Sequence, residues 1–338
     1  MLLLNDHDID KCTDIPDMLA TMAQGYRASV RALDQVPARL IITHERGRAF
    51  SLFMPASLPD SQVLGIKISS FFPANTGRGL AAVNGAVLLV DPETGLLQAM
   101  LDSAALTALR TAVMSALATD RLCSLASPNL AVVGAGVQAR AHVRAIAAIR
   151  NLRRIRVVSR DFARSCAFAA VMSEETHLPV VAVRTMDEAL EDADIVCTTT
   201  SHDSPRPLIF GYQLKHGVHI NAIGGSTLQA CEVDPQVLRH AQIHVDDPEA
   251  AARESGEISQ ALQQSIITTQ QLTALDSLLQ APASDRQSAI SYFRCVGHAS
   301  QDMLVAKYLY ATALRRQLGQ RCNYLTGSMS HSRQSAHG

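Results

Sequence analysis

The chain has 338 residues, of which 47% are hydrophobic and 18% are charged, and its formal net charge is -1. This length allows a large core and about two domains, and the lack of a basic stripe argues against nucleic acid as a partner. Seven cysteines without a C-x-x-C pair are typical of free thiols in a reducing compartment. No apolar run is long enough to span a membrane, and the N-terminus lacks the basic region of a signal peptide. We therefore expect a soluble, cytoplasmic protein.

The first third of the chain predicts a helix followed by strands that are not separated by further helices. Residues 15–33 carry apolar side chains at helical spacing. Turn-forming residues follow at 44–47, 73–79 and 92–95. Strands that succeed one another in this way favour an antiparallel sheet. The predicted strands are residues 39–42, 50–54, 63–72, 84–91 and 96–101.

A long helix is predicted next, with Asp102 or Ser103 as its N-cap and Arg110 along its length. From residue 130 onward, short apolar runs alternate with helical segments, which is typical of a doubly wound parallel sheet. The expected strands are residues 130–133, 155–158, 180–183, 195–198, 218–223, 243–245 and 289–296. We also expect helices at 250–273 and 302–318, a loop at 281–287 and a disordered tail after residue 322.

The strand at 130–133 runs directly into a glycine turn and then into a helix. The turn is Gly134-Ala135-Gly136-Val137-Gln138-Ala139, a G-x-G-x-x-A motif in the strand–turn–helix context of a dinucleotide site. Gly134 allows the tight turn, Gly136 lets the backbone approach a pyrophosphate, and Ala139 keeps the helix close to its strand. The free N–H groups of the helix N-terminus favour the phosphates, and we include Val137 and Gln138 in the predicted site.

The end of the second strand of this unit bears on the choice of cofactor. NAD sites usually place a carboxylate there, but this strand ends in Ser159-Arg160-Asp161. A hydroxyl and a guanidinium suit a 2′-phosphate better, so we favour NADP(H). NAD(H) stays open, because Asp161 could bind the ribose from a shifted register.

Several runs of residues, in this order, resemble the ornithine cyclodeaminase/mu-crystallin family. They are LGIKISSFFP, NGAVLLVDPETG, LTALRTAVMSALAT, LAVVGAGVQARAH, GVHINAIGG and VDDPEAAARESGEI. The resemblance implies a Rossmann domain (residues 123–301) inserted into an α+β substrate-binding and dimerisation domain (1–122 plus 302–338). It also implies a homodimer that acts on a small 2-amino or 2-imino acid with a nicotinamide cofactor.

Three cations are implied as ligands of the substrate carboxylate: Arg39, Lys67 and Arg110. The chemistry agrees, because arginine can hold a carboxylate with two parallel hydrogen bonds and so orient the reacting carbon. Lys67, in a mostly apolar strand, is also our candidate for the proton at the imine nitrogen. For each cation the alternative is a surface or interdomain ion pair. Thr111, Thr199 and Gly224 complete the predicted cofactor-binding set.

One departure from the family pattern concerns Ser226, which follows Gly224-Gly225. Cyclodeaminases carry an aspartate there, whereas mu-crystallin-like reductases have a serine. Serine is not a base near neutral pH without activation, so we assign Ser226 to a reductase site. The resemblance thus favours reduction of Δ1-pyrroline-2-carboxylate or Δ1-piperideine-2-carboxylate to proline or pipecolate.

Other functions stay open at this point. They are an ornithine or lysine cyclodeaminase with NAD as a recycled cofactor, an alanine dehydrogenase-like enzyme, and a binding protein for NADPH or a small ligand without turnover. We expect no metal site, because Asp246-Asp247 has no further ligand at suitable spacing. His298 and Asp302 could line the site, although Asp302 could equally cap a helix.

Overall fold

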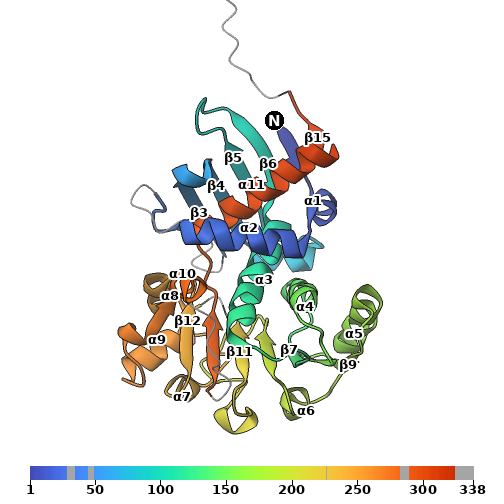
Figure 1. Cartoon of the computed structure of the whole chain (residues 1–338), viewed down its shortest axis with the longest axis vertical. Coiled ribbons are helices and arrows are strands. Elements are labelled where there is room, and N and C mark those ends of the chain that lie inside the picture. The colour runs from blue at the N-terminus through green and yellow to red at the C-terminus, as the bar shows by residue number, and fades with distance from the viewer. Residues whose placement is uncertain (29–34, 45–48, 226, 282–288, 324–338) are drawn as a thin grey trace, which may run out of the picture.

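The computed structural model describes residues 1–28, 35–44, 49–225, 227–281 and 289–323. Within these ranges the strands form two separate sheets, which lie one above the other in Figure 1. Helix α3 (Ser103–Leu122) runs between them, and a continuous hydrophobic core contains residues of α3 and of both sheets. The predicted α/β class is confirmed, as is the N-cap at Asp102, whose side chain accepts a hydrogen bond from Ala105 N at 2.7 Å.

The upper sheet has the strand order β15-β1-β6-β5-β4-β3-β2. The predicted strands form its antiparallel part, whereas the leucines at residues 2–4 add a strand, parallel to β6, that we did not predict. Helix α11 packs against β3, β4 and β5, and α2 packs beside α11. The strands are β1 (Leu2–Leu4), β2 (Leu40–His44), β3 (Ala49–Leu58), β4 (Val63–Phe71), β5 (Val83–Val90), β6 (Leu97–Asp102) and β15 (Gln320–Arg321). The helices are α1 (Asp6–Cys12), α2 (Ile15–Ala28), α11 (Ala299–Arg316) and two 3-10 turns, Pro59–Ser61 and Pro73–Arg78.

The lower sheet is parallel throughout its described strands, in the order β13-β12-β14-β11-β10-β7-β8-β9. The chain adds β8 and β9 on one side of β7 and then starts again with β10 on the other side, as in a doubly wound fold. Its strands are β7 (Asn129–Val133), β8 (Arg154–Val158), β9 (Val180–Ala182), β10 (Ile195–Thr198), β11 (His219–Ala222), β12 (Gln242–Val245), β13 (Leu272–Ala274) and β14 (Ser291–Arg294). Its helices are α4 (Val137–Ile149), α5 (Phe162–Thr176), α6 (Met186–Leu190), α7 (Pro235–Leu238), α8 (Pro248–Glu254), α9 (Gly256–Gln263) and α10 (Leu275–Gln280), with 3-10 turns at Gly211–Gln213 and Thr269–Gln271.

The single helix predicted over residues 250–273 is wrong. Ser255 has an extended backbone (φ -87°, ψ 122°), so it ends α8 and caps α9, with its side chain accepting from Ile258 N. Ser265 then takes a positive φ of 53°, and β13 follows. The apolar spacing continues across these breaks, which is why the pattern did not reveal them.

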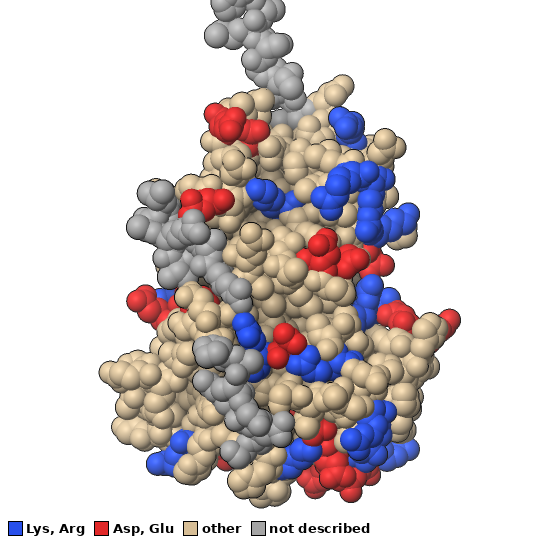
Figure 2. All heavy atoms as spheres, viewed as in Figure 1, with Lys and Arg blue, Asp and Glu red and all other residues tan. Residues whose placement is uncertain are grey.

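Parts of several predictions fall outside the described residues: the end of the helix at 15–33, the turn at 44–47, the loop at 281–287 and the tail after 322. Among the helices of the described ranges, none combines the length and apolar character needed to cross a membrane. Figure 2 shows basic and acidic side chains interspersed over the visible face, without a continuous stripe of either sign.

Candidate active site

The glycine turn lies at the carboxyl end of β7, where the strand order of the parallel sheet reverses. Gly134 has a φ of 111°, and a Cβ there would lie 2.8 Å from both the carbonyl and the hydroxyl oxygen of Thr199. Thr199 follows β10, and its hydroxyl donates to Val133 O at 3.0 Å. Ligands of open α/β sheets bind at this switch point, and only glycine fits so close to the neighbouring strand.

The N-terminus of α4 has the shape that a pyrophosphate requires. Gly136 is the N-cap, and a Cβ placed on it would meet nothing within 4 Å. Val137 is 71% exposed, whereas Ala139 is fully buried against the sheet. The side-chain oxygen of Gln138 is buried without a hydrogen-bond partner among the described residues. The first N–H groups of α4 are therefore free to bind phosphate, and these residues fit a dinucleotide.

The end of β8 offers a hydroxyl and a guanidinium. The Ser159 hydroxyl donates to Asp161 O at 2.9 Å and contacts the Ser165 hydroxyl at 2.8 Å. The carboxylate of Asp161 accepts from Ala163 N and caps α5, so it already has a structural role. Arg160 is exposed and makes no hydrogen bond or ion pair with any other described residue. Among the described residues, Asp161 thus has a structural partner, whereas Arg160 does not.

Lys67 and Arg110 are brought together by the buried carboxylate of Asp302, for which the sequence left open a place in the site or a role as a helix cap. Lys67 on β4 and Arg110 on α3 are 3% and 7% exposed, and Asp302 on α11 is 0% exposed. Lys67 Nζ lies 2.7 Å from Asp302 Oδ2, and Arg110 Nε lies 3.3 Å from Oδ1. Asp302 does not cap α11, because the N-cap is His298; the capping alternative is wrong. Burial lowers the pKa of Lys67 to about 8, although Asp302 opposes the shift.

The other side of the Arg110 guanidinium is also fixed. Its Nη1 donates to Gln301 Oε1 at 3.0 Å and lies 3.5 Å from Cys295 Sγ. Gly297 has a φ of 89°, and a Cβ on it would lie 2.7 Å from Arg110 Nη2. The absence of a side chain at Gly297 therefore lets Arg110 lie flat against the backbone.

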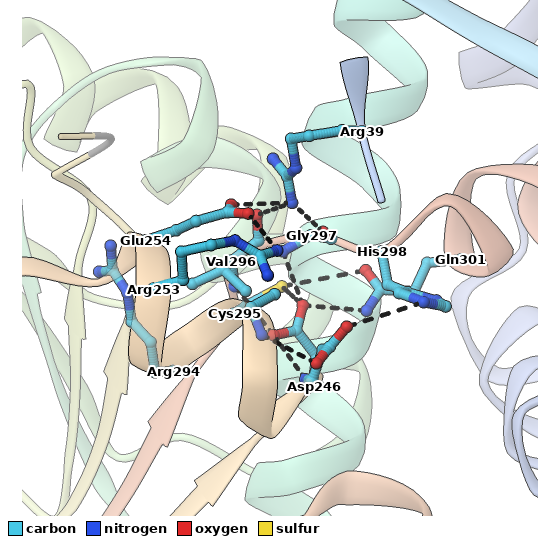
Figure 3. A network of polar contacts seen from close by, with 12 residues as sticks. Arg39, Asp246, Arg253, Glu254, Arg294, Cys295, Val296, Gly297, His298 and Gln301 are labelled. Atoms are coloured by element: carbon cyan, nitrogen blue, oxygen red, sulfur yellow. Dashed lines mark hydrogen bonds and ion pairs between the residues drawn. The ribbon is translucent and has the colours of Figure 1, made fainter. Parts of the chain in front are cut away.

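Arg39 also contacts this backbone segment (Figure 3). Its Nη2 donates to Gly297 O at 2.5 Å and to Val296 O at 3.3 Å, and it pairs with Glu254 at 3.2 Å. Arg39 thus makes the interdomain ion pair that we considered as its alternative role. It also lines a cleft of about 480 Å³ between the two sheets, so the guanidinium still borders open space.

Asp246, which follows β12, organises this segment (Figure 3). Its carboxylate accepts from Gly297 N at 2.7 Å, from Val296 N at 3.0 Å and from Gln301 Nε2 at 3.0 Å. The neighbouring Asp247 caps α8. Both residues therefore have structural partners after β12.

The loop after β11 is held by a second buried network. Arg294 donates to Gly224 O and to Gly225 O, each at 2.5 Å. Glu232 packs against Gly224 and accepts from Thr198 and Thr200. Burial, with Glu257 nearby, raises the pKa of Glu232. Ser226 lies outside the described residues, so its role stays a prediction.

The structure thus brings most of the predicted site residues to one edge of the parallel sheet. The structure does not support Thr111 as clearly as the others, because its hydroxyl already donates a hydrogen bond to Thr107 O within α3. Sequence patterns did not identify Gln301, Arg294 or Glu232 as parts of the site. Their signals were weak: Glu232 and Arg294 are polar residues beside apolar ones, which indicates a buried partner but not its identity, and Gln301 is one of several polar residues near a helix start.

Gly297→Ala is expected to displace Arg110 and raise the KM for substrate by about tenfold to a hundredfold, because small misplacements of binding groups are costly. Steady-state kinetics would measure this effect. Gly95→Ala is the matched control, since Gly95 has a similar φ of 73° but nothing within 4 Å of an added Cβ. An equal change in both variants would show that backbone strain, and not Arg110, is responsible.

A doubly wound sheet with a glycine turn at its switch point and a buried cluster of cations are the features of an NAD(P)-dependent oxidoreductase, the class to which the named relatives below also belong. The sequence model of the ornithine cyclodeaminase/mu-crystallin family matches residues 2–317, and the chain belongs to this family.

Individual relatives agree with this assignment. A Δ1-pyrroline-2-carboxylate reductase from Bacillus cereus is 29% identical over 330 residues, covering 96% of this chain and 100% of the relative. Ketimine reductase mu-crystallin from Mus musculus is 28% identical over 308 residues, 91% of this chain and 94% of the relative. The structure of Thermococcus litoralis Δ1-pyrroline-2-carboxylate reductase in complex with NADH and L-proline has a TM-score of 0.90 at 30% identity, covering 95% of this chain and 100% of that one.

Proposed function

We propose that the protein is an NAD(P)H-dependent reductase of a small cyclic imino acid. Δ1-Pyrroline-2-carboxylate or Δ1-piperideine-2-carboxylate would be converted to proline or pipecolate. The observation that carries the proposal is the buried cluster of Lys67, Arg110 and Asp302 in a chain that also has a dinucleotide turn at the switch point of its parallel sheet. The names of the relatives, and the proline bound in the Thermococcus litoralis structure, support the same substrate class.

The residues have distinct tasks in this proposal. Gly134, Gly136 and the N-terminus of α4 would hold the dinucleotide, which supplies the hydride when bound. Arg110, with Arg39, would fix the substrate carboxylate so that the imine carbon has one orientation. Lys67 would donate a proton to the imine nitrogen: an N–H bond forms there as one breaks at Nζ. An iminium carbon accepts hydride more readily than a neutral imine, because it carries more positive charge.

Absorbance of NADPH, followed with purified protein and each imino acid, tests the function, with NADH in parallel. Rapid oxidation dependent on the imino acid is the expected result. Release of ammonia from ornithine in the presence of NAD, without oxidation of either reduced coenzyme, would instead identify a cyclodeaminase. Tight NADPH binding without turnover across the imine panel would identify a binding protein.

For the cofactor we propose a preference for NADP(H), supported by Ser159, the exposed Arg160 and the structural use of Asp161. Arg160→Gln should raise the KM for NADPH by about tenfold, since one charge-assisted contact to phosphate is lost, and leave the KM for NADH unchanged. Arg153→Gln, at the opposite end of β8, is the control. If Arg160→Gln weakens both coenzymes equally, the proposed contact with the 2′-phosphate is wrong.

We also propose the division into residues 1–122 plus 302–338 and residues 123–301, with dimerisation through the former. In support, the strands of the upper sheet come from residues 2–102 and 320–321, and those of the lower sheet from 129–294. Strand β2, at the edge of the upper sheet, exposes Leu40, Ile41 and Ile42 by 59%, 52% and 43%. Analytical ultracentrifugation would establish whether a second copy covers them.

A further inference from the structure

Both oxygens of Asp302 are used by the two cations of the cluster. Apart from Lys67 and Arg110, no described group hydrogen-bonds to these oxygens. Asp302 lies in the first turn of α11, where the helix dipole favours negative charge. Helix α11 packs against both β4 and α3, which is why one side chain can reach a partner on each.

We propose that Asp302 is a positioning residue for the reduction: it fixes Lys67 Nζ relative to Arg110 and supplies the negative charge that retains the transferable proton on Lys67. This inference rests on the proposed function and deepens it, since it concerns the group that controls the proton donor. Asp302 does not need to touch the substrate.

The charges of the cluster match the proposed substrate. Two cations and one carboxylate leave one positive charge, which a single substrate carboxylate neutralises. Transfer of the proton leaves the electron pair of the broken N–H bond on Lys67 Nζ and gives the imine nitrogen the positive charge, so the total charge does not change. No reductant beyond the reduced nicotinamide of the proposed function is required.

Three charged groups act on Lys67 from different elements: Asp302 on α11, Arg110 on α3 and Arg39 just before β2. The pKa of Lys67 is lowered to about 8, chiefly by burial, and the charges of Arg110 and Arg39 act in the same direction. Among these groups Asp302 alone raises it, through its charge and its hydrogen bond. Loss of the Asp302 charge should therefore release the Lys67 proton at lower pH.

The chain has four lysines, at positions 11, 67, 215 and 307, so NMR of protein labelled with 13C at lysine Cε can follow Lys67 directly. Its signal is the one lost in Lys67→Met. In Asp302→Asn the titration midpoint of Lys67 should fall by about 1–3 pH units, the usual effect of an adjacent opposite charge. The basic limb of the pH profile of kcat/KM should move by the same amount. Substrate titration is common to all variants, so it cannot produce this difference.

Two further variants distinguish the effect of the Asp302 charge on Lys67 from a general loss of stability in α11. Asp302→Glu retains the charge and should keep the Lys67 midpoint within about half a unit of wild type. Asp17→Asn removes a carboxylate charge from α2, where Asp17 accepts a hydrogen bond from the hydroxyl of Tyr308 on α11 at 3.0 Å, and it should leave the midpoint unchanged.

An unchanged midpoint in folded Asp302→Asn would overturn the proposal. If Asp302→Asn does not fold, a fall of a full unit or more in Asp302→Glu would overturn it, since the charge is still present. Failure of the proposed function is a separate outcome: the wild-type protein would oxidise no coenzyme with any imino acid, while the NMR titration would still report on Asp302.

Discussion

Lys67→Met is expected to lower kcat/KM for the cyclic imino acid by about 10²–10⁴-fold, the range associated with loss of a general acid. The side chain is 3% exposed on β4, and its ammonium faces Asp302 at 2.7 Å. Methionine fills similar space but carries no proton. Because only the ammonium form can donate, wild-type kcat/KM should fall above pH about 8, and this limb should be absent in the variant.

The same group affects stability with a definite sign. Burial lowers the pKa of Lys67 from its ordinary value of 10.5 to about 8 in the folded protein. Between these two values the unfolded chain binds more protons, so this residue makes the free energy of unfolding rise with pH. Urea unfolding at several pH values should show a smaller rise for Lys67→Met.

Lys307→Met is the control for the kinetic measurement, since Lys307 contacts Ser61 O and lies outside the site. If Lys67→Met keeps more than about a tenth of wild-type kcat/KM, another group supplies the proton.

Arg110→Lys should raise the KM for the imino acid by about 10–100-fold, equivalent to one charge-assisted hydrogen bond, with a smaller effect on kcat. Lysine keeps the charge that Asp302 requires, but it cannot bind Asp302, Gln301 and a substrate carboxylate at once. The guanidinium presently uses Nε for Asp302 and Nη1 for Gln301. Steady-state kinetics with an imino acid and with the same cyclic imine lacking a carboxylate would measure the effect.

The wild type should discriminate strongly between these two compounds, and Arg110→Lys should lose most of that discrimination. Arg144→Lys provides the matched control, because Arg144 makes a surface ion pair with Asp10 at 2.7 Å. If discrimination against the uncharged imine is unchanged in Arg110→Lys, Arg110 does not bind the carboxylate.

The local patterns were sufficient for most of the fold. Apolar runs bounded by turn residues located β7, β8 and β10, and the glycine turn located the switch point, because these signals depend on neighbours in the chain. The break at Ser255 was missed because a cap inside a continuous apolar pattern leaves the pattern intact. The place of β14 between β11 and β12 could not be predicted, since strand order depends on contacts far apart in sequence.

For the candidate site, too, local patterns predicted individual residues but not the contacts between them. Lys67 and Arg110 were predicted through motifs, but their meeting on Asp302 depends on how α11 packs over β4 and α3. In the sequence, Gln301 and Asp302 are simply polar residues near the start of a helix. Nothing in that local pattern specifies Arg110, about 190 residues away, as their partner. Tertiary packing therefore determined which polar residues belong to the cluster.

The position of β14 has a consequence for synthesis of the chain. Ribosomes would release β11 and β12 long before the strand that separates them, so a nascent chain ending before residue 291 would present two unsatisfied strand edges. Strand β14, which pairs with both of these edges, is followed directly in the chain by Gly297, Gln301 and Asp302. Closure of the parallel sheet and completion of the cation cluster thus require the same late-synthesised part of the chain, and a prematurely terminated product would have neither.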